Sequence, residues 1–455
     1  MMFAILAHDP GRHRRPVGPA ICAVTLASLL TGCTVTAPSE SQEGAHSGHG
    51  GTDVSAAPGQ GGPGPHQHAV GPQAQPVATA EDAALQLQSL LGHHSIVAGE
   101  MMRARIRGDE DFAQSANAAL GKNTDALSEM VEVLLGESAA SQFRTLWTSH
   151  VTALFGYARG LARTDLATRE EAQSALRRFE DELAGFFVSG AQGRLPGEVA
   201  NAALQAHVHH LLQQADAYAA GDYTRADNLL REAYSHTFEL GKVLAVALLG
   251  PDKTAALQTP TWRLRSELTR LLGEHVVLAV AATRAGVTNA PDFTAAAEVV
   301  NANTADLTAA IDALFGGDAA RSFMSLWADH LDHIMAYTAA TVAQDKPRRD
   351  EARAGLDGFE DRLAAFLGGA TGNRISASEL ARALAMHDEM LIQQVDAFAA
   401  KDYQAAHDTA YSTYVHMGQL AGRLAAAFGD AAEERMPGGG PETGLGGTVQ
   451  DVGLR

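Results

Sequence analysis

The sequence FRTLWTSH at residues 143–150 and the sequence FMSLWADH at residues 323–330 share the pattern F-x-x-L-W-x-x-H. This pair belongs to a longer duplication, in which residues 84–250 recur as residues 264–430. An internal repeat of this length indicates two copies of one structural unit arranged in tandem. The sequence therefore predicts two homologous domains, and the segment 251–263 is the expected linker between them.

The segments between the matched motifs are rich in alanine and leucine, and their apolar residues recur at spacings of three and four. No segment alternates apolar and polar residues over the length of a strand. This periodicity is typical of amphipathic helices, and an aspartate that follows a histidine-bearing segment can cap the next helix. The histidines and the aspartates that follow them are His94 and Asp111, His150 and Asp165, His207 and Asp222, His275 and Asp292, His330 and Asp345, and His387 and Asp402. We therefore expect an all-α fold in which each copy is a bundle of about three helical hairpins.

Residues 1–32 are expected to be a lipoprotein signal peptide. Three arginines precede an apolar run at residues 17–30, which is too short to span a bilayer as a helix. The sequence LTGC at residues 30–33 resembles the lipobox of bacterial lipoproteins, and this resemblance implies that Cys33 is lipidated. An ordinary signal peptide with an incidental cysteine is the alternative. The lipobox interpretation predicts an extracytoplasmic protein that is lipid-anchored to the cell membrane.

Residues 33–80 are expected to be a disordered tether, because a segment so rich in Gly, Pro, Ser, Ala and Gln cannot bury enough apolar surface to fold. The tether contains histidines in H-x-x-H and H-x-H spacing, and paired imidazoles on a flexible chain can bind copper, zinc or nickel. These histidines are His46, His49, His66 and His68. The alternative is that these histidines have no role in metal binding and occur by chance in a low-complexity segment. The expected bundles then occupy residues 81–250 and 264–430, and residues 431–455 form a second disordered tail.

The formal net charge of −19 at pH 7 argues against a nucleic-acid-binding protein, because contacts with phosphate backbones require basic patches. It also argues against electrostatic docking on anionic lipids, which attract basic segments. The two cysteines, Cys22 and Cys33, lie in the expected signal peptide or directly after it. The mature protein would therefore contain no free thiol and no disulfide, which excludes a cysteine nucleophile.

Each copy carries four histidines at matched positions on the apolar faces of four different expected helices. They are His94, His150, His207 and His236 in the first copy and His275, His330, His387 and His416 in the second. One interpretation is that all are core histidines paired with nearby polar groups, because a buried imidazole requires a hydrogen-bond partner. Candidate partners in the second copy are Asn303, Thr304, Tyr337 and Gln394.

A second interpretation of these histidines is a transition-metal site in each bundle, since imidazole nitrogen suits zinc, copper, iron and nickel. Metal-binding histidines are commonly oriented by hydrogen bonds from neighbouring side chains. The residues expected in that role are Asn123, Tyr157, Asn303 and Tyr337. A third interpretation is an oxygen-activating or redox enzyme. No Glu-x-x-His pair is shared between the copies, although such pairs are typical of carboxylate-rich di-iron bundles.

Five further histidines occur in one copy only. They are His93, His209 and His210 in the first copy and His333 and His407 in the second. An H-x-x-H spacing such as that of residues 330–333 places two imidazoles on one face of a helix. Such residues can add ligands to a metal site, but the partner copy lacks them. We therefore expect these five histidines to be solvated.

The repeated motifs resemble a helical module of secreted and surface proteins of Gram-positive bacteria, which are often labelled copper amine oxidase-like. In this chain the motifs are LLGEH at residues 271–275, N-A-N-T-x-D-L at residues 301–307, the F-x-x-L-W-x-x-H pattern, a D-Y pair and a later Y-x-H. The resemblance covers nearly all of residues 84–430. It does not imply amine oxidase activity, because copper amine oxidases resemble one another in a large β-rich domain with a cofactor-forming Asn-Tyr-Asp/Glu sequence. This chain contains no Asn-Tyr dipeptide.

The function expected from the sequence is non-catalytic binding of a transition metal, copper first and zinc second, for sequestration or delivery. The matched core histidines would be the ligands, and the membrane would be reached through the lipid anchor. The first alternative is a structural or interaction module of the cell envelope that packs against a protein partner and binds no metal. The second alternative is a metal-dependent redox enzyme. No P-loop, H-E-x-x-H or G-x-S-x-G sequence supports any other catalytic class.

Overall fold

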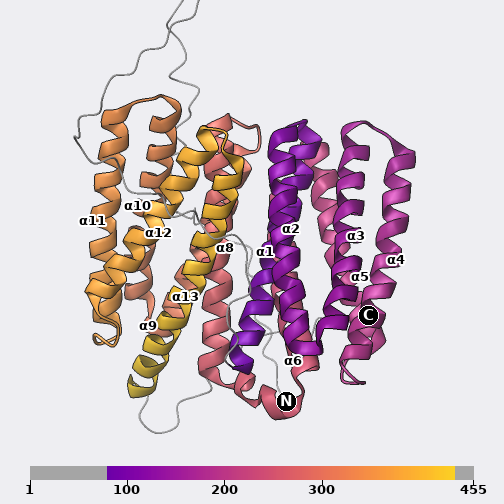
Figure 1. Cartoon of the computed structure of the whole chain (residues 1–455). Helices are drawn as coiled ribbons and strands as arrows, with labels where there is room; N and C mark the ends of the chain where they lie inside the picture. The colour runs from indigo at the N-terminus through magenta and orange to yellow at the C-terminus, as the bar shows by residue number, and fades with distance from the viewer. Residues whose placement is uncertain (1–78, 436–455) are drawn as a thin grey trace, which may run out of the picture. The chain divides into compact units, whose positions relative to one another are not determined.

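The computed structural model describes residues 79–435 of the chain, and it describes side chains as far as residue 429 (Figure 1). The expected signal peptide, the lipidation site Cys33 and residues 436–455 of the expected disordered tail lie outside the described residues, whereas residues 431–435 of that tail continue the last helix. The same holds for the tether histidines His46, His49, His66 and His68. These sites therefore stay predictions from the sequence.

The described residues form helices and no strands, so the all-α prediction is confirmed. The first copy contains α1 (Ala80–Arg107), α2 (Glu110–Leu135), α3 (Glu137–Ala162), α4 (Leu166–Gly190), α5 (Gly197–Ala219) and α6 (Tyr223–Leu249). The second copy contains α8 (Pro260–Thr288), α9 (Phe293–Phe315), α10 (Gly317–Val342), α11 (Lys346–Ala370), α12 (Ala377–Ala399) and α13 (Tyr403–Arg435). Each copy is thus a bundle of three helical hairpins, as expected.

The linker between the copies is helical and shorter than the sequence suggested. The short helix α7 (Pro251–Thr254) and the 3-10 turn η2 (Ala255–Gln258) lead directly into α8, which begins at Pro260. The side chain of Thr259 caps α8 by accepting a hydrogen bond from the backbone N–H of Trp262. A proline fits the first turn of a helix because its missing N–H would have had no partner there.

Four of the six aspartates that were expected to cap helices do so with their side chains. Asp165, Asp222, Asp345 and Asp402 each accept a hydrogen bond from the backbone N–H three residues later. In α2 the cap is Asp109 and not Asp111, which lies within the first turn. Asp292 occupies the cap position of α9 without making the side-chain hydrogen bond. The capping aspartates explain why the helices begin at nearly matched places in the two copies.

The two copies pack against each other through pairs of corresponding helices. α1 packs mainly against α6 in the first copy, and α8 packs mainly against α13 in the second. Between the copies, α2 contacts α13, α6 contacts α9, and α1 contacts α8, which lies beside it in Figure 1. Because α2 corresponds to α9 and α6 to α13, these contacts are those of a pseudo-symmetric pair. All thirteen numbered helices belong to one compact unit.

The repeated tyrosine of the Y-x-H motif lies where the copies meet. The hydroxyl of Tyr234 donates to the carbonyl of Arg270 at 3.1 Å, and that of Tyr414 donates to the carbonyl of Ser89 at 3.0 Å. The two hydroxyl oxygens lie 3.2 Å apart. A Cβ on Gly273 would come within 2.7 Å of both tyrosine side chains, which explains the glycine of the L-L-G motif at this position. These motif residues therefore serve the contact between the copies.

One described helix, α8, is long and apolar enough to cross a membrane by length and composition. However, 83% of its most apolar window is buried inside the protein. That degree of burial is equally typical of a central helix of a bundle, and α8 occupies that place in the second copy.

The helices α1 and α6 approach each other closely at Gly241, and this gives a stability prediction. A Cβ on Gly241 would lie 2.5 Å from the Cα of Gln88 and 2.7 Å from its backbone nitrogen. Since backbone atoms and not a flexible side chain must move, we expect Gly241→Ala to destabilise the protein by about 1–3 kcal/mol. Gly185→Ala is the matched control, because an added Cβ there meets nothing within 4 Å in an exposed helix interior. That control should gain about 0.5–1 kcal/mol. Urea unfolding midpoints measure both, and equal shifts of the two variants would contradict the prediction.

Candidate metal centres

Three of the four matched histidines of each copy converge in the middle of its bundle. His94, His150 and His207 come from α1, α3 and α5 and form triad 1. His275, His330 and His387 come from α8, α10 and α12 and form triad 2. In each triad, one ring nitrogen from every histidine lies within 4.8 Å of the others. None of the six side chains is more than 1% exposed.

Aromatic side chains enclose triad 1. The Nε2 atoms of His94 and His150 are 3.1 Å apart, and the ring centroids of His94 and His207 are 5.5 Å apart. The Trp147 ring lies 4.7 Å from the His94 ring, and the Phe179 ring stacks on His150 at 4.3 Å. Trp147 and His150 are one turn apart on α3, so the W-x-x-H motif places one ligand and one wall of the site together.

Triad 2 repeats this arrangement with more even spacing. Its three ring centroids are separated by 5.6, 5.7 and 5.6 Å. The Trp327 ring lies 4.7 Å from the His275 ring, and the Phe359 ring stacks on His330 at 4.6 Å. The same construction has therefore been kept in both copies.

Most of the imidazole nitrogens in the triads have no hydrogen-bond partner. In triad 2 this holds for both ring nitrogens of His275 and His387 and for Nε2 of His330. In triad 1 it holds for Nδ1 of His94 and for both nitrogens of His207. Buried polar groups are paired in the great majority of cases, and an exception calls for an ion, a water molecule or a functional reason. Each triad can hold a metal ion through these nitrogens.

The hydrogen bonds that the triad 1 histidines do make suit metal binding. Nδ1 of His150 lies 2.6 Å from the carbonyl oxygen of Trp147, which can only accept, so Nδ1 carries the proton. Nε2 of His150 therefore presents its lone pair toward His94. A tetrahedral zinc ion with Zn–N bonds of about 2.0 Å separates its nitrogen ligands by about 3.3 Å. The pair His94 and His150 already has nearly that separation, and a ligand nitrogen of His207 lies within 4.8 Å of both.

Burial keeps the triad histidines neutral. It lowers the pKa of all six imidazoles, and neighbouring histidines lower several of them further. The pKa values of His150 and His275 fall to about 3. A neutral imidazole offers a lone pair and a protonated one does not, so the triads are ready to bind a metal ion at neutral pH.

The fourth matched histidine of each copy lies outside the triad. Nε2 of His236 is 2.8 Å from the carbonyl oxygen of Ala203, and Nε2 of His416 is 2.8 Å from that of Ala383. These hydrogen bonds hold the two rings against α5 and α12, as expected for satisfied core histidines. A position on the apolar face of a helix predicts the direction in which a side chain points. It does not predict at which level along the bundle axis that side chain meets the other helices.

Each asparagine expected to orient a ligand is hydrogen-bonded to the helix that carries the first histidine of its triad. Nδ2 of Asn123 donates to the carbonyl of Leu90 at 2.9 Å, and Nδ2 of Asn303 donates to that of Leu271 at 3.1 Å. The Oδ1 atom of each asparagine has no partner. The side chain of Asn123 also interacts with His94 and raises its pKa, although burial has the larger, opposite effect. Asn123 is thus placed to orient His94.

The expected tyrosines serve another purpose. The hydroxyl of Tyr157 donates to the carboxylate of Asp216 at 2.9 Å, and that of Tyr337 donates to the carboxylate of Asp396 at 2.9 Å. Arg169 also donates to the hydroxyl of Tyr157. These bonds join α3 to α5 and α10 to α12. Both hydroxyls are therefore engaged with carboxylates and not with triad histidines.

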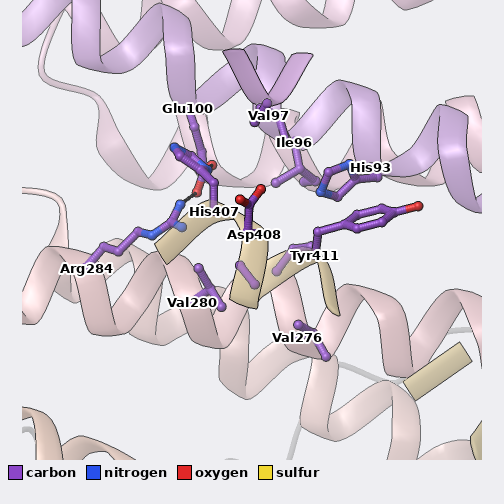
Figure 2. A pocket seen from close by; sticks show the side chains of 13 residues that line it. His93, Ile96, Val97, Glu100, Val276, Val280, Arg284, His407, Asp408 and Tyr411 are labelled. Atoms are coloured by element: carbon purple, nitrogen blue, oxygen red, sulfur yellow. Dashed lines mark hydrogen bonds and ion pairs between the residues drawn. The ribbon is translucent and has the colours of Figure 1, made fainter. Parts of the chain in front are cut away.

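Two of the five unshared histidines are buried, which corrects the expectation that all five are solvated. His93 and His407 are 6% and 4% exposed, whereas His209 is exposed and His210 and His333 are half-buried. Figure 2 shows His93 and His407 with Glu100 and Arg284 around a cavity of about 20 Å³ where the copies meet. A cavity of this size has room for about one water molecule. The contact between the two copies, which the separate helices do not reveal, accounts for the burial.

Ion pairs across the same contact balance its buried charges. Nη1 of Arg284 lies 2.5 Å from Oε1 of Glu100, and Nζ of Lys122 lies 2.5 Å from Oδ1 of Asp408. Nδ1 of His407 lies 3.8 Å from Oε2 of Glu100. Because each acidic group has a basic partner, these residues form a structural network between the copies.

Asp388 is a site residue that the sequence interpretation missed. It follows His387 on α12, is 2% exposed, and places Oδ1 at 3.2 Å from Nδ1 of His330. Burial raises the pKa of Asp388, and the neighbouring Glu360 raises it further. The first copy has Val208 at the matched position after His207. A buried acid beside a shared histidine, present in one copy only, is the signal in the sequence that marks this residue.

Comparisons with protein-family models, with curated proteins and with solved structures gave no match to this chain.

Proposed function

We propose that this protein binds one transition-metal ion in each bundle, with the three histidines of triad 1 and of triad 2 as ligands, and that it stores or delivers the metal without catalysis. The observation that carries the proposal is the convergence of three buried imidazoles in both copies, with most of their ring nitrogens lacking a hydrogen-bond partner. Leaving such groups unpaired costs free energy in a metal-free core, and a bound cation would recover it.

Copper is the first candidate and zinc the second. Imidazole ligands suit both metals, and copper(II) forms the most stable complexes among the divalent first-row ions. The triads contain neither a thiolate nor a thioether, so the ligands themselves do not select a soft ion. Full burial favours storage or delivery over turnover, because a catalytic metal keeps an open position for substrate or water.

We place this function at the outer face of the cell membrane. The LTGC sequence at residues 30–33 supports lipid anchoring through Cys33, and residues 33–80 supply a tether that bears four histidines. Those histidines can collect metal ions near the membrane and pass them to the bundles. The acidic net charge of −19 favours the approach of cations and disfavours nucleic acid as a partner.

Metal content tests the proposal directly. The protein is purified without residues 1–32, with Cys33→Ser and with the four tether histidines replaced by alanine, and is dialysed against copper or zinc. We expect two equivalents of metal per chain and a rise in the melting temperature, because the ligand set occurs only in the folded state. His94→Leu and His275→Leu should each remove one equivalent.

The matched control for this experiment is His416→Leu, which alters a histidine that is repeated in both copies but lies outside the triads. It should retain both equivalents. If the unsubstituted triads take up no stoichiometric metal and show no thermal shift with copper or zinc, the proposal is wrong. The histidines are then core residues of a structural or interaction module.

A further inference from the structure

We propose that the two metal sites are inequivalent, and that Asp388 makes triad 2 the tighter site for a divalent cation. This inference rests on the proposed function, since it assigns a difference in affinity to the same two sites. Asp388 would not bind the ion itself. It would act through His330 and contribute a negative charge next to the ligands.

The geometry places Asp388 behind a ligand. In triad 1, Nε2 of His150 faces the other histidines, and Nδ1 faces the carbonyl of Trp147. The matched histidine of triad 2, His330, has Nδ1 turned instead to Oδ1 of Asp388 at 3.2 Å. A carboxylate that accepts a hydrogen bond from the distal N–H of a metal-binding histidine fixes the orientation of the ring and makes the other nitrogen a stronger ligand. Triad 1 has a neutral carbonyl in this role.

The two sites also differ in the negative charge available near the ligands, and this difference again favours triad 2. A divalent ion in a dry core needs nearby negative charge, because the cost of burying an ion rises steeply with its charge. Asp388 is 2% exposed, and its carboxyl lies between His330 and the side chain of Glu360, with which it also interacts. At the matched position of triad 1 the side chain is Val208, which carries no charge. At this matched position, a buried acid thus lies next to a triad histidine in the second copy only.

The correspondence between the two copies also suggests a substitution of Asp388 that should allow the protein to fold. Valine occupies the matched position in the first copy, where it is 3% exposed and packs in an equivalent bundle. Asp388→Val therefore introduces a side chain that this fold already accepts. Asp388→Asn keeps the shape of the side chain and removes only the charge, so it separates the two contributions.

The test measures zinc affinity at one site at a time, by competition with a chromogenic chelator. In the chain without tether histidines, His94→Leu leaves triad 2 as the remaining site, and His275→Leu leaves triad 1. We expect triad 2 to bind Zn²⁺ about 10–100-fold more tightly than triad 1. Adding Asp388→Val or Asp388→Asn to the His94→Leu chain should abolish that difference.

The matched control is Glu389→Gln, which removes the same charge from the next residue on α12. Glu389 pairs with Arg353 at 2.8 Å and does not contact the triad, so its loss should leave the affinity unchanged. Equal affinities at the two sites, or an unchanged affinity of triad 2 in Asp388→Asn, would overturn the inference while leaving the proposed function intact. If neither single-site chain binds zinc, the inference is overturned, and if neither binds copper as well, the proposed function is overturned too.

Discussion

Between pH 6.5 and pH 5 the metal-free protein is expected to lose most of its stability and to unfold. The cause is the set of buried histidines whose pKa lies below the ordinary value of 6.5. They are His93, His94, His150, His207, His275, His330, His387 and His407. The unfolded chain takes up protons at these residues below pH 6.5, and the folded chain does not. Acid therefore favours unfolding.

The size of the loss in stability can be derived from the histidines whose lowered pKa has a definite value. The pKa values of His93, His150 and His275 fall to about 3, so each contributes on the order of 2 kcal/mol of destabilisation at pH 5. A few such residues are enough to exhaust a typical stability of about 5–15 kcal/mol. Carboxyls with raised pKa values oppose the trend, because they add stability as the pH falls; they are Glu180, Asp227, Asp332, Glu360 and Asp388. We expect the eight fully buried imidazoles to outweigh these five carboxyls.

Circular dichroism at 222 nm, recorded in the presence of a chelator from pH 8 to pH 4, measures this transition. Saturating zinc should move its midpoint to a lower pH, because metal and protons compete for the same nitrogens. A melting temperature that stays constant between pH 7 and pH 5 in the metal-free protein would show that the imidazoles are not buried in their neutral form.

The second large effect is expected from His275→Leu, which should stabilise the metal-free protein by about 1–3 kcal/mol while abolishing metal binding at triad 2. His275 is 0% exposed, and both of its ring nitrogens lack a partner. Leucine has a similar volume and no polar atom to leave unpaired, so it should pack against Trp327 at lower cost. A gain in stability with a loss of function is typical of residues kept for a site.

His416→Leu is the matched comparison, and the opposite sign is expected. Its Nε2 donates to the carbonyl of Ala383, so the substitution breaks a formed hydrogen bond and leaves that carbonyl unpaired. We expect a loss of about 1 kcal/mol. Urea unfolding of both variants in the presence of a chelator measures these two changes in the free energy of unfolding. If His275→Leu destabilises the protein as much as His416→Leu does, the triad imidazoles are satisfied core groups and the metal proposal loses its main support.

The bundles were predictable because their determinants are local in the chain. The apolar spacing within each copy predicts helices, and the duplication predicts that both copies fold alike. Capping aspartates such as Asp165 and Asp345 mark helix starts through bonds that span three residues. The errors occur where the local signal is ambiguous. Asp109 and Asp111 lie close together before α2, and only the backbone geometry decides which of them is the cap.

The candidate site was only partly predictable. The sequence places eight matched histidines on apolar faces, and the structure brings six of them into two triads. His236 and His416 share the same pattern but bond to backbone carbonyls. The contact network of His93 and His407 involves helices from both copies, so no pattern within one copy reveals it.

By itself the sequence determined the all-α class, the tandem duplication and the choice of apolar faces, because these depend on residue spacing along single helices. The tertiary structure alone decided which histidines meet, that the tyrosines of the Y-x-H motif join the copies, and that Asp388 lies behind His330. Such contacts depend on how far each helix is rotated and shifted against its neighbours. That arrangement is set by packing among residues that are distant in the chain.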